Sequence, residues 1–166
     1  KVMASACLPL LFKTVWVDGD PYWDGGYSGN PPLYPLIYKS GSEDVVIVQI
    51  NPLHVEEVPT GANEILDRIN EISFNSTLMR EMRAIAFVSK LKGKGVLEDE
   101  YKNMRVHLID TQDILGGLGR MSKMNADWDF LNYLYEAGVQ SATDWLDKNY
   151  DDLGRKSTVD IHDVYL

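Results

Sequence analysis

The sequence predicts an α/β fold in which a mainly parallel sheet is flanked by helices. Segment 45–50 is a continuous run rich in valine and isoleucine, the kind of strand that is buried on both faces of a parallel sheet. Segment 105–109 is a second, shorter strand candidate. Apolar residues between and after these segments recur at helical spacing, and strands that alternate with helices are typical of a sheet with helical layers. The length of 166 residues fits one domain, residues 1–166.

A β-hairpin is predicted close to the N-terminus. Segment 15–17 is apolar and aromatic and leads into the dipeptide Asp18-Gly19, and segment 22–24 leads away from it. Asp-Gly is a turn dipeptide that tolerates positive φ, so local geometry accounts for Asp18 without a catalytic role.

Helices are expected in three parts of the chain. A short helix follows the proline-rich segment 30–35 and packs on the sheet. A long helical region begins at about Gly61 and is expected to break near Asn75. Its apolar positions are Ile65, Ile69, Ile72, Leu78, Met82, Ile85 and Ala86. Later, Asn125 is expected to cap one helix, and a further helix is expected over 138–150. The apolar positions of these two helices are Trp128, Leu131, Leu134, Ala142, Trp145 and Leu146.

Composition argues against several classes of function. The chain carries 25 Asp and Glu against 16 Lys and Arg, and this formal net charge of −9 repels phosphate backbones, so nucleic-acid binding is not expected. No apolar run reaches the roughly 18 residues that span a bilayer, so no transmembrane segment is expected. The single cysteine, Cys7, excludes an intrachain disulfide, and a cytoplasmic or peripheral-membrane location is expected.

The histidines do not suggest a metal centre. His54, His107 and His162 are scattered without the spacing of metal ligands, so no metal site and no cofactor are expected. His107 falls inside the strand candidate 105–109 and is interpreted as a core histidine with a satisfied hydrogen bond.

An ordered series of motifs occupies the first 36 residues. They are Ala4-Ser5-Ala6, Leu8-Pro9, Phe12, Asp18-Gly19, Tyr22-Trp23-Asp24-Gly25-Gly26 and Asn30-Pro31-Pro32. This series resembles the aspartate region of the patatin-like phospholipases, with a close match from Met3 to Leu36. Segments 45–50, 71–75 and 158–160 resemble bacterial members of the family more loosely.

The resemblance implies a fold, an activity and a site. The fold is the C-terminal portion of a patatin-like three-layer α/β/α sandwich, with an incomplete sheet. The activity is hydrolysis of lipid acyl esters by a Ser-Asp dyad, and Asp24 is the position that matches the catalytic aspartate. Such an aspartate accepts the proton of the serine hydroxyl as the ester carbonyl is attacked. Gly25 and Gly26 are expected to position it, because a backbone without Cβ atoms turns sharply and approaches other loops closely.

Two residues of this region have simpler interpretations as well. Asp24 with its two glycines can form an ordinary turn in which the carboxylate binds its own backbone, but the flanking motifs favour the catalytic role. Asn30 can either fix the Asp24 turn by a hydrogen bond or be an Asn-Pro loop residue without a notable partner.

The nucleophile of the family is not found in this sequence. The nearest match to G-x-S-x-G is 26–30, and Ser28 is rejected because it is too close to Asp24 and no apolar strand directly precedes it. The glycines at 116, 117 and 119 follow the aspartate and lack the strand-to-helix setting of an oxyanion or anion-binding loop. This chain alone is therefore expected to be inactive.

The partner of such a chain is expected to be another stretch of polypeptide. The sequence begins at Lys1 directly before an apolar segment, and the expectation is that an upstream segment is missing and delivers the serine. Either this segment or a second copy of the chain would cover the apolar edge and face that its absence exposes. The alternative is a catalytically inactive patatin-like fragment that binds a lipid or a protein.

Overall fold

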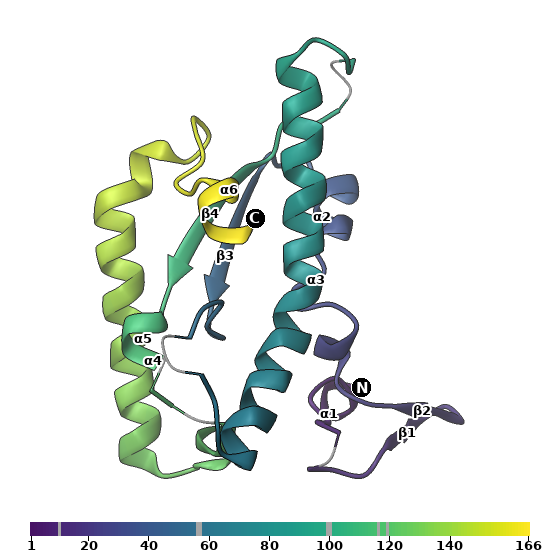
Figure 1. Ribbon diagram of the computed structural model, residues 1–166, viewed down its shortest axis with the longest axis vertical. Helices are drawn as coiled ribbons and strands as arrows, with labels where there is room; N and C mark the ends of the chain where they lie inside the picture. The colour runs from purple at the N-terminus through teal and green to yellow at the C-terminus, as the bar shows by residue number, and fades with distance from the viewer. Residues whose placement is uncertain (10, 56–57, 99–100, 116, 119) are drawn as a thin grey trace.

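The computed structural model describes residues 1–9, 11–55, 58–98, 101–115, 117–118 and 120–166, except for the side chains of Arg120 and Met121. It is a mixed α/β structure, as predicted (Figure 1). The strands are β1 (Val15–Val17), β2 (Asp20–Tyr22), β3 (Asp44–Gln49) and β4 (Arg105–Asp110). The α-helices are α1 (Val2–Ser5), α2 (Tyr34–Lys39), α3 (Ala62–Gly93), α4 (Gln112–Leu115), α5 (Trp128–Asn149) and α6 (Ile161–Tyr165). Three 3₁₀ turns are η1 (Gly25–Tyr27), η2 (Arg120–Met124) and η3 (Tyr150–Asp152).

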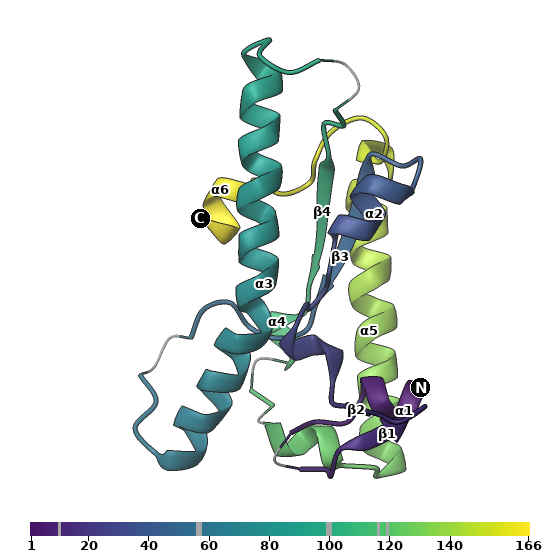
Figure 2. The ribbon, with the colours of Figure 1, turned by 90° about the vertical axis from the view of Figure 1, so that its right-hand side faces the viewer.

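Strands β3 and β4 form a parallel two-stranded sheet at the centre of the molecule, with Asp44 opposite Arg105 and Gln49 opposite Asp110. Helices α3 and α6 lie on one side of this sheet and α5 lies on the other (Figure 2). The buried core joins the sheet to α3 and α6. Its members are Leu33, Val45, Ile47, Leu78, Met82, Ile85, Met104, Val106 and Tyr165.

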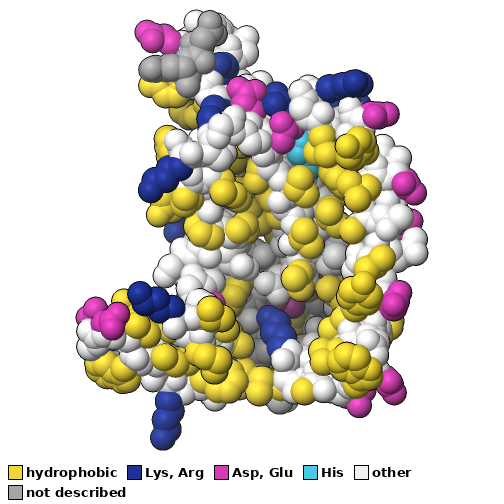
Figure 3. All heavy atoms as spheres, turned by 180° about the vertical axis from the view of Figure 1, so that it is seen from behind, with side chains coloured by type: hydrophobic (Ala, Val, Ile, Leu, Met, Phe, Trp, Pro, Cys, Tyr) yellow, Lys and Arg dark blue, Asp and Glu magenta, His cyan; other side chains and the backbone are white. Residues whose placement is uncertain are grey.

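The prediction that strand 45–50 is buried on both faces is wrong. Val45 and Ile47 face the core, but Val46 is 46% exposed and Val48 is 57% exposed. The reason is that α5 packs mainly against β4, and none of its described residues is fully buried. Figure 3 shows hydrophobic side chains gathered over this side of the molecule, away from α6.

The expected break in the long helix is also wrong, because α3 runs without interruption from Ala62 to Gly93. The helix instead changes direction between its two halves (Figure 2). The hydroxyl of Ser73 donates to the Ile69 carbonyl and that of Ser76 donates to the Ser73 carbonyl. Such bonds back to the preceding turn of the backbone often bend a helix.

The two helices expected after Asn125 are one helix, α5, and Gly138 lies in its interior. The N-cap is Asp127, whose carboxylate accepts the N–H of Phe130 at 3.1 Å. Asn125 does not cap the helix as predicted. Its side chain accepts the N–H of Asp127 at 3.0 Å and so holds the capping residue in place.

The predicted hairpin is confirmed, with β1 and β2 antiparallel. Asp18 and Gly19 have φ values of 53° and 93°, the pair of positive angles that a tight two-residue hairpin turn requires. The predicted short helix after the prolines is α2, and Leu33 just before it is buried.

The amino ends of β3 and β4 are tied together by Asp44. Its carboxylate binds Arg105 through Nε at 3.0 Å and Nη2 at 2.8 Å, and also accepts the N–H of Gly154 at 2.9 Å. His107 is completely buried, as expected of a core histidine, and its Nε2 lies 3.0 Å from Asp44 Oδ1. Over the described residues, no helix is long and apolar enough to cross a membrane.

Candidate active site

Asp24 stands at the N-terminus of the 3₁₀ turn η1 and is half-buried. Its backbone N–H donates to the Cys7 carbonyl at 2.9 Å, which ties the turn to the segment after α1. Its Oδ1 accepts the N–H of Gly26 at 2.7 Å. Among the described residues, Oδ2 has no hydrogen-bond partner. The carboxylate therefore caps its own turn with one oxygen and has the other available for a further donor.

The two glycines after Asp24 have different surroundings. A Cβ atom built on Gly26 would overlap Cε1 of Phe74 and would lie 3.0 Å from Asp24 Oδ1. A Cβ atom on Gly25 would meet nothing within 4 Å. Gly26 is thus required by a close approach to α3, whereas Gly25 faces open space beside Asp24.

A stripe of four side chains on α3 holds the segment that follows Asp24. We call Asn70, Phe74, Thr77 and Glu81 the α3 stripe. Because residues three and four apart share one face of a helix, the stripe forms a continuous surface along α3. The stripe was not predicted, although the spacing of these mostly polar residues can be read from the sequence.

Each member of the α3 stripe contacts a successive part of segment 26–33. The Tyr27 hydroxyl donates to Asn70 Oδ1 at 2.8 Å, and the Tyr27 and Phe74 rings meet edge to face with centroids 4.8 Å apart. Further along, Thr77 Oγ1 accepts the N–H of Asn30 at 3.0 Å, and Glu81 accepts the N–H of Leu33 at 2.7 Å. The orientation of the Asp24 turn is therefore set by α3, some 50 residues later in the sequence.

Asn30 acts here through its backbone, since its N–H is the group bound by Thr77. The residue also lines a cavity of about 240 Å³ at the carboxyl end of β3, together with Gln49, Asn51 and Phe74. Phe74 thus contacts the turn after Asp24 and also lines the cavity at the end of the sheet.

A second cavity, of about 400 Å³, lies beside Asp24. It is lined by Trp23 and Gly25, the two neighbours of Asp24, but not by Asp24 itself. The other lining residues are Lys1, Ala4, Ser5, Val17, Asp18 and Tyr22. Its walls are mostly apolar and come from α1 and the hairpin. A hydrocarbon chain would be compatible with such a surface.

Other candidate residues lie outside this arrangement. Ser28 is exposed at the end of η1, and its N–H donates to the Gly25 carbonyl at 2.9 Å. Gly117 lies in a turn, and Gly116 and Gly119 lie outside the described residues. In the part of the chain that is described, no group of three or more His, Cys, Asp and Glu side chains could hold a metal ion.

The structure thus defines a mixed α/β protein that presents a carboxylate on a glycine turn held by a long helix. Residues 2–37 match the family model of patatin-like phospholipase, a family of lipid hydrolases. This stretch contains Asp24, Gly25, Gly26 and Asn30, and it lies in the N-terminal part of the chain. Neither a curated protein sequence nor a solved structure matched the chain.

Proposed function

We propose that this chain supplies the catalytic aspartate of a patatin-like serine acyl hydrolase, with Asp24 as the general base of a Ser-Asp dyad. The serine would come from a polypeptide segment outside residues 1–166. The observation that carries the proposal is that the family match over residues 2–37 includes the turn that presents Asp24.

The proposed reaction begins with attack of the serine Oγ on the carbonyl carbon of a lipid ester. Asp24 accepts the serine proton, the tetrahedral intermediate collapses, and the proton passes to the departing alcohol. Water then attacks the acyl-enzyme with Asp24 again accepting a proton, which releases a fatty acid and regenerates the serine. Oδ2 of Asp24, which has no hydrogen-bond partner among the described residues, is the oxygen suited to these transfers.

Two further features support the proposal. The cavity beside Asp24 has apolar walls that would accommodate an acyl chain. In the described part of the chain β3 pairs with β4 along one edge only, so its other edge can accept a further strand. A strand added there would widen the parallel sheet, and its carboxyl end would lie beside the carboxyl end of β3.

The test is complementation with a segment that carries a G-x-S-x-G motif, supplied in fusion or as a separate chain. The assembly is expected to hydrolyse p-nitrophenyl butyrate, and Asp24→Asn is expected to lower kcat by about 10²–10⁴-fold. Asp18→Asn is a matched control, since Asn tolerates the positive φ of that turn position. An Asp24→Asn assembly that retains the full rate would refute the role of Asp24.

A second candidate function is a catalytically inactive patatin-like module that binds a lipid or a protein. The absence of a G-x-S-x-G motif from the sequence favours it. The intact mass of the endogenous protein discriminates between the two. A mass that leaves no room for a nucleophile segment supports the inactive module if a separately added G-x-S-x-G segment also gives no hydrolysis, and a larger mass supports the hydrolase.

A further inference from the structure

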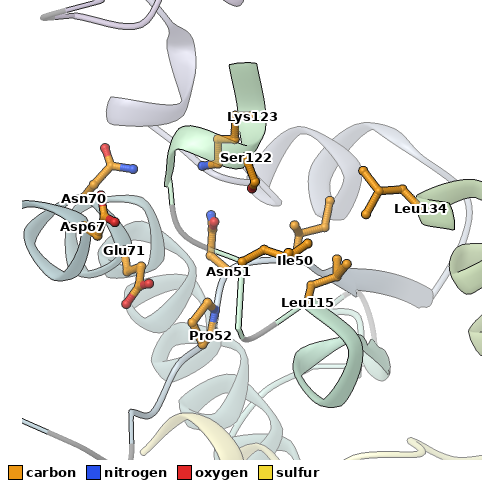
Figure 4. A pocket seen from close by; sticks show the side chains of 11 residues that line it. Ile50, Asn51, Pro52, Asp67, Asn70, Glu71, Leu115, Ser122, Lys123 and Leu134 are labelled. Carbon is orange, nitrogen blue, oxygen red and sulfur yellow. The ribbon is translucent and has the colours of Figure 1, made fainter. Parts of the chain in front are cut away.

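A groove follows the carboxyl end of the central sheet and is separate from the cavity beside Asp24. Its first part, about 150 Å³, lies between β3, α3 and η2 (Figure 4). Its second part, about 300 Å³, lies between β3, α4 and α5. The two parts share Ile50, Leu115 and Leu134, so they form one continuous surface, which we call the edge groove.

One end of the edge groove is almost purely apolar. Val48 and Ile50 are 57% and 59% exposed there, although both belong to or directly follow the central strand β3. Ala137 and Gly138 of α5 form the opposite wall. Exposing such large aliphatic side chains at the centre of a fold costs free energy, which an apolar ligand would recover by covering them.

The other end of the edge groove adds polar side chains to its apolar lining, among them the cationic side chain of Lys123. Figure 4 shows Lys123 and Ser122 above Asn51, with Asn70 on the α3 side and the apolar residues on the other. The ammonium of Lys123 lies 5.6 Å from the centroid of the Phe74 ring. Within the described residues it has no carboxylate partner. A cation–π contact holds the ammonium near the groove without neutralising its charge.

The two acidic residues of the same cavity are already engaged. Glu71 forms an ion pair with Arg68 at 3.1 Å, and Asp67 also has an interaction of its own. Among the described side chains that line this cavity, Lys123 is the cation that can select an anionic ligand. Nearby, Gln49 is more than nine-tenths buried at the Lys123 end of the sheet, and its Oε1 has no partner among the described atoms.

We propose that the edge groove binds a single-chain anionic amphiphile with the chemistry of a fatty acid. The carboxylate lies at Lys123 with the amides of Asn51 and Asn70, and the aliphatic chain runs past Ile50 and Leu134 toward Gly138. The positive charge of Lys123 selects an anionic head group, and the apolar end of the groove accommodates an aliphatic chain. The inference goes beyond the proposed function, because it uses neither Asp24 nor a nucleophile.

The experiment measures displacement of the fluorescent fatty acid cis-parinarate from the isolated chain. Decanoate is expected to displace it, and decanol at equal concentration is expected to do so about 5-fold less effectively, because it lacks the charge that pairs with Lys123. Lys123→Gln is expected to weaken decanoate binding about 5-fold and to leave decanol unchanged. Lys148→Gln, in the last turn of α5, is the matched control and is expected to change neither.

A second variant tests the position of the chain. A Cβ atom at Gly138 would meet nothing within 4 Å, and leucine favours a helix interior more than glycine does. Gly138 lines the groove, so Gly138→Leu is expected to fold and to fill it. It should reduce cis-parinarate binding more than 10-fold, whereas Gly138→Ala, which leaves the groove open, should not. Circular dichroism is used to check that both variants remain helical.

Three results would overturn the inference. They are unchanged binding in both Lys123→Gln and Gly138→Leu, equal displacement by decanol and decanoate, and a dimer in light scattering that Gly138→Leu converts to monomer. The last would show that a second copy of the chain covers the groove. Asp24→Asn should not alter binding, so failure of the proposed hydrolase function and failure of this inference are distinguishable.

Discussion

Gly26 lies against the ring of Phe74 with no room for a side chain between them. A Cβ atom at Gly26 would overlap Phe74 Cε1 and would lie 3.1 Å from Cδ1 of the same ring. This contact fixes the distance between the turn that presents Asp24 and the long helix α3. The close approach, rather than backbone conformation, is the reason for a glycine, since Gly26 does not have positive φ.

We expect Gly26→Ala to destabilise the fold by about 1–3 kcal/mol, because overpacking forces the turn or the Phe74 ring to shift. Gly25→Ala is the matched control and should change stability by less than about 0.5 kcal/mol, since its side chain meets nothing. Urea unfolding followed by circular dichroism gives both values. Equal effects of the two substitutions would contradict the proposed contact.

Thr77→Val tests whether the α3 stripe holds the chain near Asn30. The substitution removes the acceptor of the Asn30 N–H while keeping the shape of the side chain, and a part-buried donor without a partner costs about 1–2 kcal/mol. Thr143→Val in α5 is the control, because its hydroxyl only bonds the exposed carbonyl of Val139. A loss in Thr77→Val no larger than in Thr143→Val would count against the stripe.

The ion pair between Asp44 and Arg105 at the amino end of the sheet makes the stability of the fold depend on pH in the acidic range. The hydrogen bonds from Arg105, together with His107 and Gly154, hold the pKa of Asp44 well below its ordinary value of 3.8. Because the folded state favours the ionised form, Asp44 stabilises the fold above about pH 4, and this contribution is lost as the pH falls further.

Asp44→Asn is therefore expected to lower stability at pH 7 by about 2 kcal/mol and to lose less stability than the native chain between pH 5 and pH 2. The measurement is Tm as a function of pH. Asp147→Asn on the exposed side of α5 serves as control and should keep the native pH profile. A native acid profile in Asp44→Asn would rule out this origin of the acid sensitivity.

Tyr165 makes the stability of the fold fall as the pH rises in the alkaline range. Burial, and secondarily the negative charge of Asp110, raise the pKa of Tyr165 to about 12 from its ordinary value of 10.0. The folded state thus favours the neutral phenol, and this stabilising contribution is present below pH 10 and is lost as the pH rises toward 12.

Tyr165→Phe should leave stability at pH 7 unchanged or raise it by up to about 1 kcal/mol, because the buried hydroxyl has no partner among the described atoms. The variant should also lose less stability between pH 10 and pH 12 than the native chain. Urea midpoints at pH 7 and pH 11 test both points, with the exposed Tyr133→Phe as control. A marked loss at pH 7 would show that the hydroxyl does have a stabilising partner.

Local sequence patterns predicted the elements that depend on neighbouring residues. The hairpin followed from Asp18-Gly19, and both central strands followed from their apolar runs. The errors arose where distant contacts or competing caps decide the outcome. Asn75 did not end α3 because its side chain is buried and bonds Gln49 at 3.2 Å and Pro52 at 2.8 Å, which supports the helix there.

For the candidate site, the sequence pointed to residues but not to their geometry. The motif around Asp24 marked the carboxylate and its glycines, and the family match covers the same stretch. Nothing local distinguished Gly25 from Gly26, because the difference lies in the ring of Phe74. Likewise the position of Lys123 at the edge groove became visible only beside the cavity that it lines.

The sequence by itself determined the strands, the hairpin turn and the carboxylate on its glycine turn, because these follow from dihedral preferences and apolar periodicity over a few residues. Only the tertiary structure decided that α3 holds this turn, that one face of β3 stays uncovered, and that Asp44 binds Arg105 and His107. These depend on contacts between segments tens of residues apart, which short-range preferences do not specify.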